Sequence, residues 1–289
     1  MSYLTGADIT CDNGFQPAVN PDTSIVMFGE FWDIGTRVIK WYEKGGYNGY
    51  DTSKKVIEVE NRKTGKIKKK VIKGKRYGGR WPRPNRKLSA IQAFMVHHTG
   101  GYLPGVCFNT LHNERRLSVQ FILDDQGVIY QTLDCKEIAW HGGGQNRRSI
   151  GVECCLYPRA ADNPGAYRES KCKRLGLAPH DAGDCYIQGK TRKVFFMPRA
   201  QVDSLAFLIA GTWAAMNKKQ GIDLEGAPIF PPLPDGTPSY DFKESFAKHR
   251  GLLAHANTNP GKWDPAGLDF VYLEDRVQTI YEAIMNGTK

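Results

Sequence analysis

Long apolar runs are missing from this chain of 289 residues. No stretch approaches the roughly 18 consecutive apolar residues that a helix needs to span a bilayer. The opening residues, Met1 to Asp8, also lack the basic segment and the apolar stretch of a signal peptide. We therefore expect no transmembrane segment and a protein made in the cytoplasm, which could reach a target outside the cell only by release or by another export route.

Two common cysteine and metal patterns are absent as well. The seven cysteines form an odd set without a CxxC pair, which argues against a closed disulfide framework and a cysteine zinc finger. Only Cys172 and Cys185, which share one loop-rich stretch, are candidates for a disulfide. The motif HExxH does not occur, and this removes the commonest helical plan for a zinc protease.

The composition is that of an ordinary globular protein, with 40% hydrophobic and 11% aromatic residues. A chain of this length can bury one sizeable core, or one core with a smaller annex. Its net charge of +10 and pI near 9.2 predict attraction to polyanions, which include nucleic acid, acidic lipid and anionic cell-wall polymers. The charge does not choose among them, but no interleaving of aromatic and basic residues supports a specific nucleic-acid partner.

Residues 1–88 differ from the rest in their residue pattern and are predicted to form a basic N-terminal extension. They end in a segment dense in lysine and arginine, and the two prolines of the run Arg80 to Lys87 disfavour both helix and central strand. Residues 56–60 and 67–72 flank a glycine-containing turn and predict a basic β-hairpin. Its lysines either line a solvated sheet face or dock on a polyanion.

Residues 89–289 alternate between strand and helix patterns, which predicts an α/β domain with a mixed central sheet flanked by helices. We expect the main strands at 91–97, 120–123, 128–132 and 149–156, and core-facing helices near 202–216 and 273–284. Gly287 is placed to end the last helix. The stretch from about 157 to 198 is long for a connection, and its Pro, Gly, Lys and Asp residues predict an insertion over the sheet.

Candidate metal ligands stand at the ends of predicted strands. A short apolar strand delivers His97 and His98 as the chain enters a glycine-rich loop. Because side chains alternate along a strand, the two histidines point to opposite faces, and only one should bind a given metal. A second strand-like segment ends in His255 and runs into a proline-stiffened loop with Lys262 and Asp264. Each residue taken alone also fits an ordinary structural histidine or a surface loop.

Two imidazoles and one carboxylate suit zinc, which prefers nitrogen and oxygen donors and keeps a fourth position for water when three protein ligands hold it. Such a water can ionise with a pKa of about 7 and attack an amide. On strand 149–156, Glu153 shares the more polar face with Ser149 and Gly151. A strand glutamate is usually exposed or ion-paired, but beside an activated water it would be a fitting general base.

Four motifs occur in an order that resembles one family. They are Val96-His97-His98-Thr99, Ala139-Trp140-His141-Gly142, Ser149-Ile150-Gly151-Val152-Glu153, and His255 with Lys262, Asp264 and Pro265. Together they resemble the type 2 N-acetylmuramoyl-L-alanine amidases, a family that includes peptidoglycan recognition proteins and amidase-type phage lysozymes. Any one motif is weak, whereas four in the right order are specific. The resemblance covers about residues 90 to 285 without the insertion, and it implies the peptidoglycan recognition/amidase fold.

The resemblance implies zinc-dependent hydrolysis of the amide between the N-acetylmuramoyl lactyl group and L-alanine in peptidoglycan. His97, His255 and Asp264 match the zinc ligands, with Asp264 in place of cysteine, and the retention of all three favours an active enzyme. Glu153 matches the residue that activates the hydrolytic water, and Lys262 matches the residue that stabilises the oxyanion. Four further residues are expected near the substrate groove: Trp140, His141, Asn146 and Arg147.

Two positions depart from the family pattern. Val119 and Gln120 stand where many members have an aromatic residue and a histidine, and Ala266 separates Pro265 from the usual glycine, here Gly267. Neither departure removes a ligand. They bear on the shape of the groove and on the geometry of the ligand loop.

Other functions are weighed against the amidase. A non-catalytic peptidoglycan-binding module would be marked by the loss of a zinc ligand, which the sequence does not show, and a nucleic-acid-binding protein rests on charge alone. As a setting, a bacteriolytic phage lysis enzyme, or endolysin, leads over a virion or secretion-system effector and a cytoplasmic wall-recycling amidase. The basic extension could dock on anionic wall polymers or outer-membrane lipid.

Overall fold

The computed structural model describes residues 21–51, 54–60, 67–73, 86–220 and 226–287. Its largest sheet has six strands: in spatial order β12 (Gly251–Ala254), β6 (Ala93–His98), β9 (Ser149–Cys154), β7 (Phe121–Leu123), β8 (Ile129–Gln131) and β3 (Val38–Lys40). Neighbouring strands are parallel except for the antiparallel pair β7 and β8. The predicted α/β architecture with a mixed central sheet is thus confirmed.

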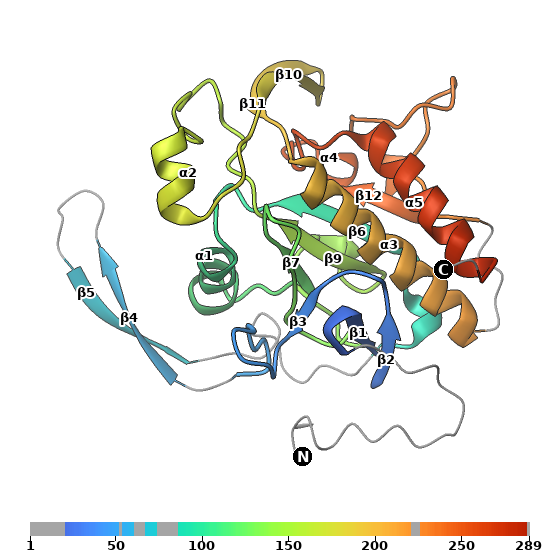
Figure 1. The fold of residues 1–289 in the computed structure, drawn as a ribbon, viewed down its shortest axis with the longest axis horizontal. Helices are drawn as coiled ribbons and strands as arrows, with labels where there is room; N and C mark the ends of the chain where they lie inside the picture. The colour runs from blue at the N-terminus through green and yellow to red at the C-terminus, as the bar shows by residue number, and fades with distance from the viewer. Residues whose placement is uncertain (1–20, 52–53, 61–66, 74–85, 221–225, 288–289) are drawn as a thin grey trace.

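Two long helices, α3 (Arg199–Gln220) and α5 (Phe270–Met285), lie across one face of this sheet (Figure 1). Strand residues that face them, such as Phe94 and Val152, belong to the main apolar core together with residues of both helices. Both helices were expected from their apolar spacing. Asp269 caps α5 by accepting a hydrogen bond from the Tyr272 backbone at 3.0 Å, and Gly287 follows its end with a φ of +71°.

The alternate residues of β6 and β9 face the opposite side of the sheet, which carries the candidate site. This side is covered near β7 by α1 (Pro104–Phe108) and the π-helical turn Asn109–Arg115, which pack on Ile122 and Cys155. The loop after residue 139 covers the other part. Its Gly142 approaches Met95 so closely that a Cβ there would lie 2.6 Å from the Met95 sulfur.

Part of the expected N-terminal extension is built into the fold. A hairpin of β1 (Ser24–Met27) and β2 (Glu30–Asp33) leads to β3, which pairs with β8 in the main sheet, and Ile25 and Met27 lie in the main core. The strands β4 (Lys54–Glu60) and β5 (Ile67–Lys73) pair antiparallel where a basic hairpin was expected. Its turn and most of the predicted boundary segment lie outside the described residues.

The insertion contains α2 (Glu169–Leu175) and an antiparallel hairpin of β10 (Ala182–Ile187) and β11 (Lys190–Phe195). The hairpin turn reaches the segment around the short helix α4 (His255–Thr258): Gln188 donates to the carbonyls of Ala256 and Asn259. After β11, the Met197 backbone N–H donates to the Gly267 carbonyl at 2.9 Å. Cys172 and Cys185 are both free thiols, so the one candidate disulfide is not formed.

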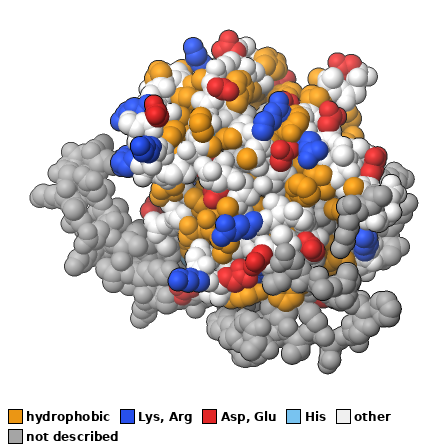
Figure 2. Space-filling model, in the orientation of Figure 1, with side chains coloured by type: hydrophobic (Ala, Val, Ile, Leu, Met, Phe, Trp, Pro, Cys, Tyr) orange, Lys and Arg blue, Asp and Glu red, His pale blue; other side chains and the backbone are white. Residues whose placement is uncertain are grey.

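Basic, acidic and apolar side chains intermix on the face that carries α3 and α5 (Figure 2). Among the described residues, no helix combines the length and the apolar character that crossing a membrane requires.

Candidate metal centre

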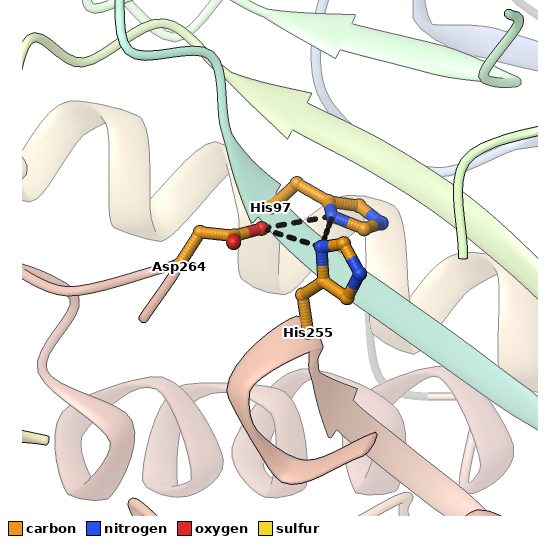
Figure 3. Close-up of side chains that lie close together, drawn as sticks. All are labelled: His97, His255 and Asp264. Carbon is orange, nitrogen blue, oxygen red and sulfur yellow. Dashed lines mark hydrogen bonds and ion pairs between the residues drawn. The ribbon is translucent and has the colours of Figure 1, made fainter. Parts of the chain in front are cut away.

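Three side chains bring one donor atom each to a common point (Figure 3). His97 Nδ1 lies 3.1 Å from His255 Nδ1, and both nitrogens lie 3.0 Å from Asp264 Oδ2. The atoms form a nearly equilateral triangle. Its edges are close to the roughly 3.3 Å that separates ligand atoms in a tetrahedral site with bonds of about 2.0 Å.

The strand register explains why these residues meet. In the parallel pairs, Ala254 lies opposite Val96, and His97 lies opposite Glu153, so the carboxyl ends of β12, β6 and β9 share one edge. His255 follows β12 directly, at the start of α4. The Ala254 N–H donates to Asn257 Oδ1 at 2.9 Å, which turns the chain sharply after the strand.

The Asp264 loop returns to the same edge. The Ala256 backbone N–H donates to the Asp264 carbonyl at 2.9 Å, and the Asp264–Pro265 peptide bond is cis. The hydrogen bond from Ala256 holds Asp264 beside His255, whereas His97 lies 167 residues away along the chain.

Burial and hydrogen bonds set the charge states of His97 and Asp264. Burial lowers the pKa of His97 to about 4, so this imidazole is neutral near pH 7. Burial acts to raise the pKa of Asp264, but hydrogen bonds with His255 and His97 outweigh it and hold that pKa well below the usual range. A neutral imidazole and an ionised carboxylate are the forms that bind a metal, so the donor set fits a zinc ion.

The triangle lies in the wall of a cavity of about 480 Å³, which Glu153 and Lys262 also line. Burial, reinforced by the nearby Asp264 carboxylate, raises the pKa of Glu153 well above its ordinary value. Lys262 is exposed at the rim and its backbone N–H donates to the Asn259 carbonyl at 3.0 Å. The cavity therefore places an acid–base group and a cation beside the predicted ligands.

His98 takes the opposite side of β6 from His97, as strand alternation predicts. It also lines the cavity, where its ring meets the Trp263 ring edge-on at a centroid distance of 5.2 Å. Neither ring nitrogen of His98 has a hydrogen-bond partner in the described part of the chain. The guanidinium groups of Arg159 and Arg192, both from the insertion, lie 5.7 and 5.1 Å from the Trp263 ring centre.

Three residues that line the cavity were not predicted from the sequence: Arg115, Arg159 and Trp263. A signal existed for Arg159, because it follows the carboxyl end of β9 by a few residues and so belongs to the edge that carries the ligands. Arg115 ends a helical turn whose position over the sheet no local pattern reveals. Trp263 could have been predicted from its position in the sequence, because it lies between Lys262 and Asp264 in the ligand loop.

The four expected groove residues occupy different places. His141 lines the cavity, whereas the described lining does not include Trp140, Asn146 or Arg147. Asn146 is buried, and its Oδ1 accepts hydrogen bonds from the backbones of His141 and Gly142 at 3.0 and 2.8 Å. Trp140 packs against the small apolar cluster of Leu133 and Ala139, and Arg147 is exposed. Their roles as substrate contacts stay predictions.

Gln120 and Ala266, where the sequence departs from the family pattern, are both buried parts of the fold. Gln120 is buried and bridges two segments: its Nε2 donates to the Glu137 carbonyl at 2.9 Å, and its Oε1 accepts from the Gly151 backbone at 2.8 Å. It supports β9 from the next strand. Ala266 is also buried, and Gly267 beyond it holds a φ of +91°, a conformation that favours glycine.

A two-histidine, one-carboxylate centre at the ends of sheet strands, with an acidic group and a lysine facing it, is typical of metal-dependent hydrolases. The family comparison is more specific. Residues 87–267, more than half of the chain, match the N-acetylmuramoyl-L-alanine amidase family model, and the chain belongs to that family. It is therefore a peptidoglycan amidase by family, as the sequence motifs predicted.

Several solved structures are similar to this chain at low identity. AmpDh3 from Pseudomonas aeruginosa, in complex with anhydromuramic pentapeptide, is 16% identical over 68% of this chain and 63% of its own, with a TM-score of 0.38. AmiA from Staphylococcus aureus is 14% identical over 72% and 83%, with a TM-score of 0.39. The endolysin LysCS from Clostridium intestinale is 14% identical over 72% and 91%, with a TM-score of 0.35. No curated protein sequence matches the chain.

Proposed function

We propose that this amidase requires zinc and hydrolyses the bond between the lactyl group of N-acetylmuramic acid and the L-alanine of the stem peptide. One observation carries the proposal: three donor atoms, from His97, His255 and Asp264, converge within 3.1 Å in a cavity that Glu153 and Lys262 share. Three protein ligands leave one position open, as in catalytic rather than structural zinc sites.

A zinc ion held by these ligands would supply Lewis-acid activation of water and of the scissile carbonyl. The remaining work falls to side chains of the cavity. Glu153 takes a proton from the attacking water while the water oxygen bonds to the carbonyl carbon. As the carbon–nitrogen bond breaks, Glu153 returns that proton to the departing amine of L-alanine. Its raised pKa suits a group that must hold the proton between the two steps.

Lys262 is proposed to stabilise the negative charge that develops on the carbonyl oxygen. Its side chain is exposed at the rim, and no ion pair of Lys262 occurs among the described residues. An unpaired ammonium beside the reacting carbonyl favours the tetrahedral state over the planar substrate.

The test is mass spectrometry of purified peptidoglycan after digestion, with and without a chelator. We expect stem peptides with a free L-alanine amine from the zinc-loaded enzyme only. Asp264→Ala should lose both zinc and activity, whereas Glu153→Gln should keep zinc and lose about 10²- to 10⁴-fold in turnover. The surface change Glu244→Gln is the control and should alter neither. Full activity in a zinc-free variant, or cleavage of another bond, would contradict the proposal.

We further propose that the enzyme acts on the cell wall as a phage lysis enzyme. The net charge of +10 supports attraction to anionic wall polymers or outer-membrane lipid. Intact sacculi and soluble muropeptides should both be cleaved, and replacing Lys68, Lys69 and Lys70 by glutamate should weaken binding to sacculi. Cleavage of soluble fragments alone would favour a wall-recycling amidase, and binding without cleavage would favour a non-catalytic module.

A further inference from the structure

A chain of polar groups runs from His97 away from the metal centre. His97 turns its Nδ1 toward His255 and Asp264, and its other ring nitrogen, Nε2, lies 3.0 Å from His141 Nδ1. On the far side of the His141 ring, Nε2 lies 3.5 Å from Ser149 Oγ. The Ser149 hydroxyl in turn donates to the Gln145 carbonyl at 2.8 Å. Three side chains thus link the centre to a backbone carbonyl.

The carbonyl at the end fixes the direction of every hydrogen bond in this chain. A carbonyl oxygen can only accept, so the single hydroxyl hydrogen of Ser149 points at Gln145. Ser149 Oγ can then only accept, which places a hydrogen on His141 Nε2. In the neutral ring, His141 Nδ1 is consequently an acceptor, and the hydrogen between the two rings belongs to His97 Nε2.

The same reasoning leaves His97 Nδ1 without a hydrogen. Its lone pair then points at the Asp264 carboxylate oxygen, 3.0 Å away, which is also an acceptor. Two acceptors at this distance repel each other unless a cation lies beside them. The hydrogen-bond chain therefore prepares the one tautomer of His97 that can bind a metal through Nδ1.

We propose that His141 and Ser149 are positioning residues that hold His97 in its metal-binding tautomer and thereby set the affinity of the site for zinc. The inference rests on the zinc site of the proposed function, and it gives His141 a place behind the ligand in addition to any contact with substrate.

The surroundings of His141 fix the orientation of its ring. A Cβ on Gly151 would lie 2.6 to 2.7 Å from three atoms of the imidazole, so the ring packs directly on the bare backbone of β9. The His141 backbone is held as well, because its N–H donates to Asn146 Oδ1 at 3.0 Å. Ser149 is fully buried, and its hydroxyl is held in place by the bond to Gln145. A ring that served only to fill space would not need these polar partners.

The test measures the zinc affinity of the purified full-length protein by competition with a chromophoric chelator. His141→Phe keeps an aromatic ring but removes the acceptor, and we expect about 10- to 100-fold weaker zinc binding. Ser149→Ala removes only the last hydroxyl and should weaken binding about 3- to 10-fold. His141→Asn should restore part of the loss, because its Oδ1 can take the place of the imidazole Nδ1.

Thr212→Ala is the matched control, because it also removes a fully buried hydroxyl, one without a hydrogen-bond partner in the described residues. It should leave zinc affinity unchanged. Nitrogen-15 NMR of the zinc-loaded wild type should show hydrogens on Nε2 of both His97 and His141. If His141→Phe fails to fold, Ser149→Ala and the NMR spectrum decide the question.

The outcomes separate the two proposals. Wild-type affinity in both His141→Phe and Ser149→Ala, or a hydrogen on His141 Nδ1 in the spectrum, would overturn the positioning role and leave the zinc site standing. Failure of the wild type to bind zinc would overturn the proposed metal centre, and the positioning role with it.

Discussion

Replacing Gly267 by alanine should damage both the stability of the fold and the metal loop. Gly267 has a φ of +91°, and a Cβ added there would lie 2.3 Å from the Phe195 carbonyl oxygen and 3.1 Å from a methyl of Leu156. The carbonyl belongs to the last residue of β11 and cannot swing aside as a side chain could. Relief requires the metal loop and the insertion to move apart, which would strain the bond between Met197 N–H and the Gly267 carbonyl.

Two costs add up at this position. A left-handed backbone costs a residue with a Cβ about 1 to 2 kcal/mol, and overpacking a close contact costs about 1 to 3 kcal/mol more. We expect Gly267→Ala to lower the free energy of unfolding by about 2 to 5 kcal/mol in urea titrations. Zinc affinity should fall too, because Asp264 lies in the loop that must move.

Gly236→Ala isolates the first cost. Gly236 has a φ of +85°, but a Cβ there would meet no atom within 4 Å, so only the backbone term of about 1 to 2 kcal/mol applies. Equal losses of stability in the two variants, or unchanged zinc affinity in Gly267→Ala, would refute the coupling between insertion and metal loop.

Three further predictions concern the metal, the lysine and pH. Chelation should lower the melting temperature by about 5 to 10 °C relative to protein with free zinc at 100 times the Kd, and His97→Ala should show no such shift in differential scanning fluorimetry. Lys262→Met should keep full zinc content and lose about 10²- to 10³-fold in turnover, and wild-type kinetics would remove its assigned role. Burial raises the pKa of Glu274 from 4.5 to about 6, so the group favours folding below pH 4.5 and loses this contribution as pH rises through 6. The Glu274→Gln side chain can still accept from the Phe230 N–H. Between pH 4.5 and 7, its free energy of unfolding in urea should rise by up to about 1 kcal/mol relative to the wild type, a limit set by solvent screening of this partly exposed group. A difference between the two proteins that does not change with pH would contradict this.

Much of the fold followed from apolar runs and apolar spacing, because the central strands are short apolar runs buried on both faces and α5 buries apolar residues at helical spacing. The strand expected at 149–156 is β9 (Ser149–Cys154), and the helix expected near 273–284 lies within α5 (Phe270–Met285). The pairing of β3 with β8 was not foreseen. A strand of three residues carries little periodic signal, and its partner lies far along the chain. The insertion was expected but its β10–β11 hairpin was not, because most of the side chains of these two strands are exposed or half-buried and leave no regular apolar pattern in the sequence.

The site could be predicted as a set of residues but not as an arrangement in space. The order of motifs pointed to His97, His255 and Asp264, and strand alternation placed Glu153 on the polar face. Alternation also put Ser149 on that face, yet it could not show that the His141 ring lies against the same strand. Contacts between a loop and a strand depend on ring orientation, which sequence spacing does not encode.

The position of β12 at the rim of the central sheet has a consequence for handling the enzyme. An outermost strand offers unpaired backbone groups to any other chain, and this hazard grows when the strand is apolar. Here the Ile229 carbonyl accepts from Leu252 N–H, and Asn257 accepts from Ala254 N–H. These two bonds cover the outer edge of β12. Asn257 lies in the same short helix as the ligand His255, so a metal ion bound to His255 would also hold Asn257 in place against the strand. Self-association through the uncovered strand is the failure we expect first in preparations stripped of metal.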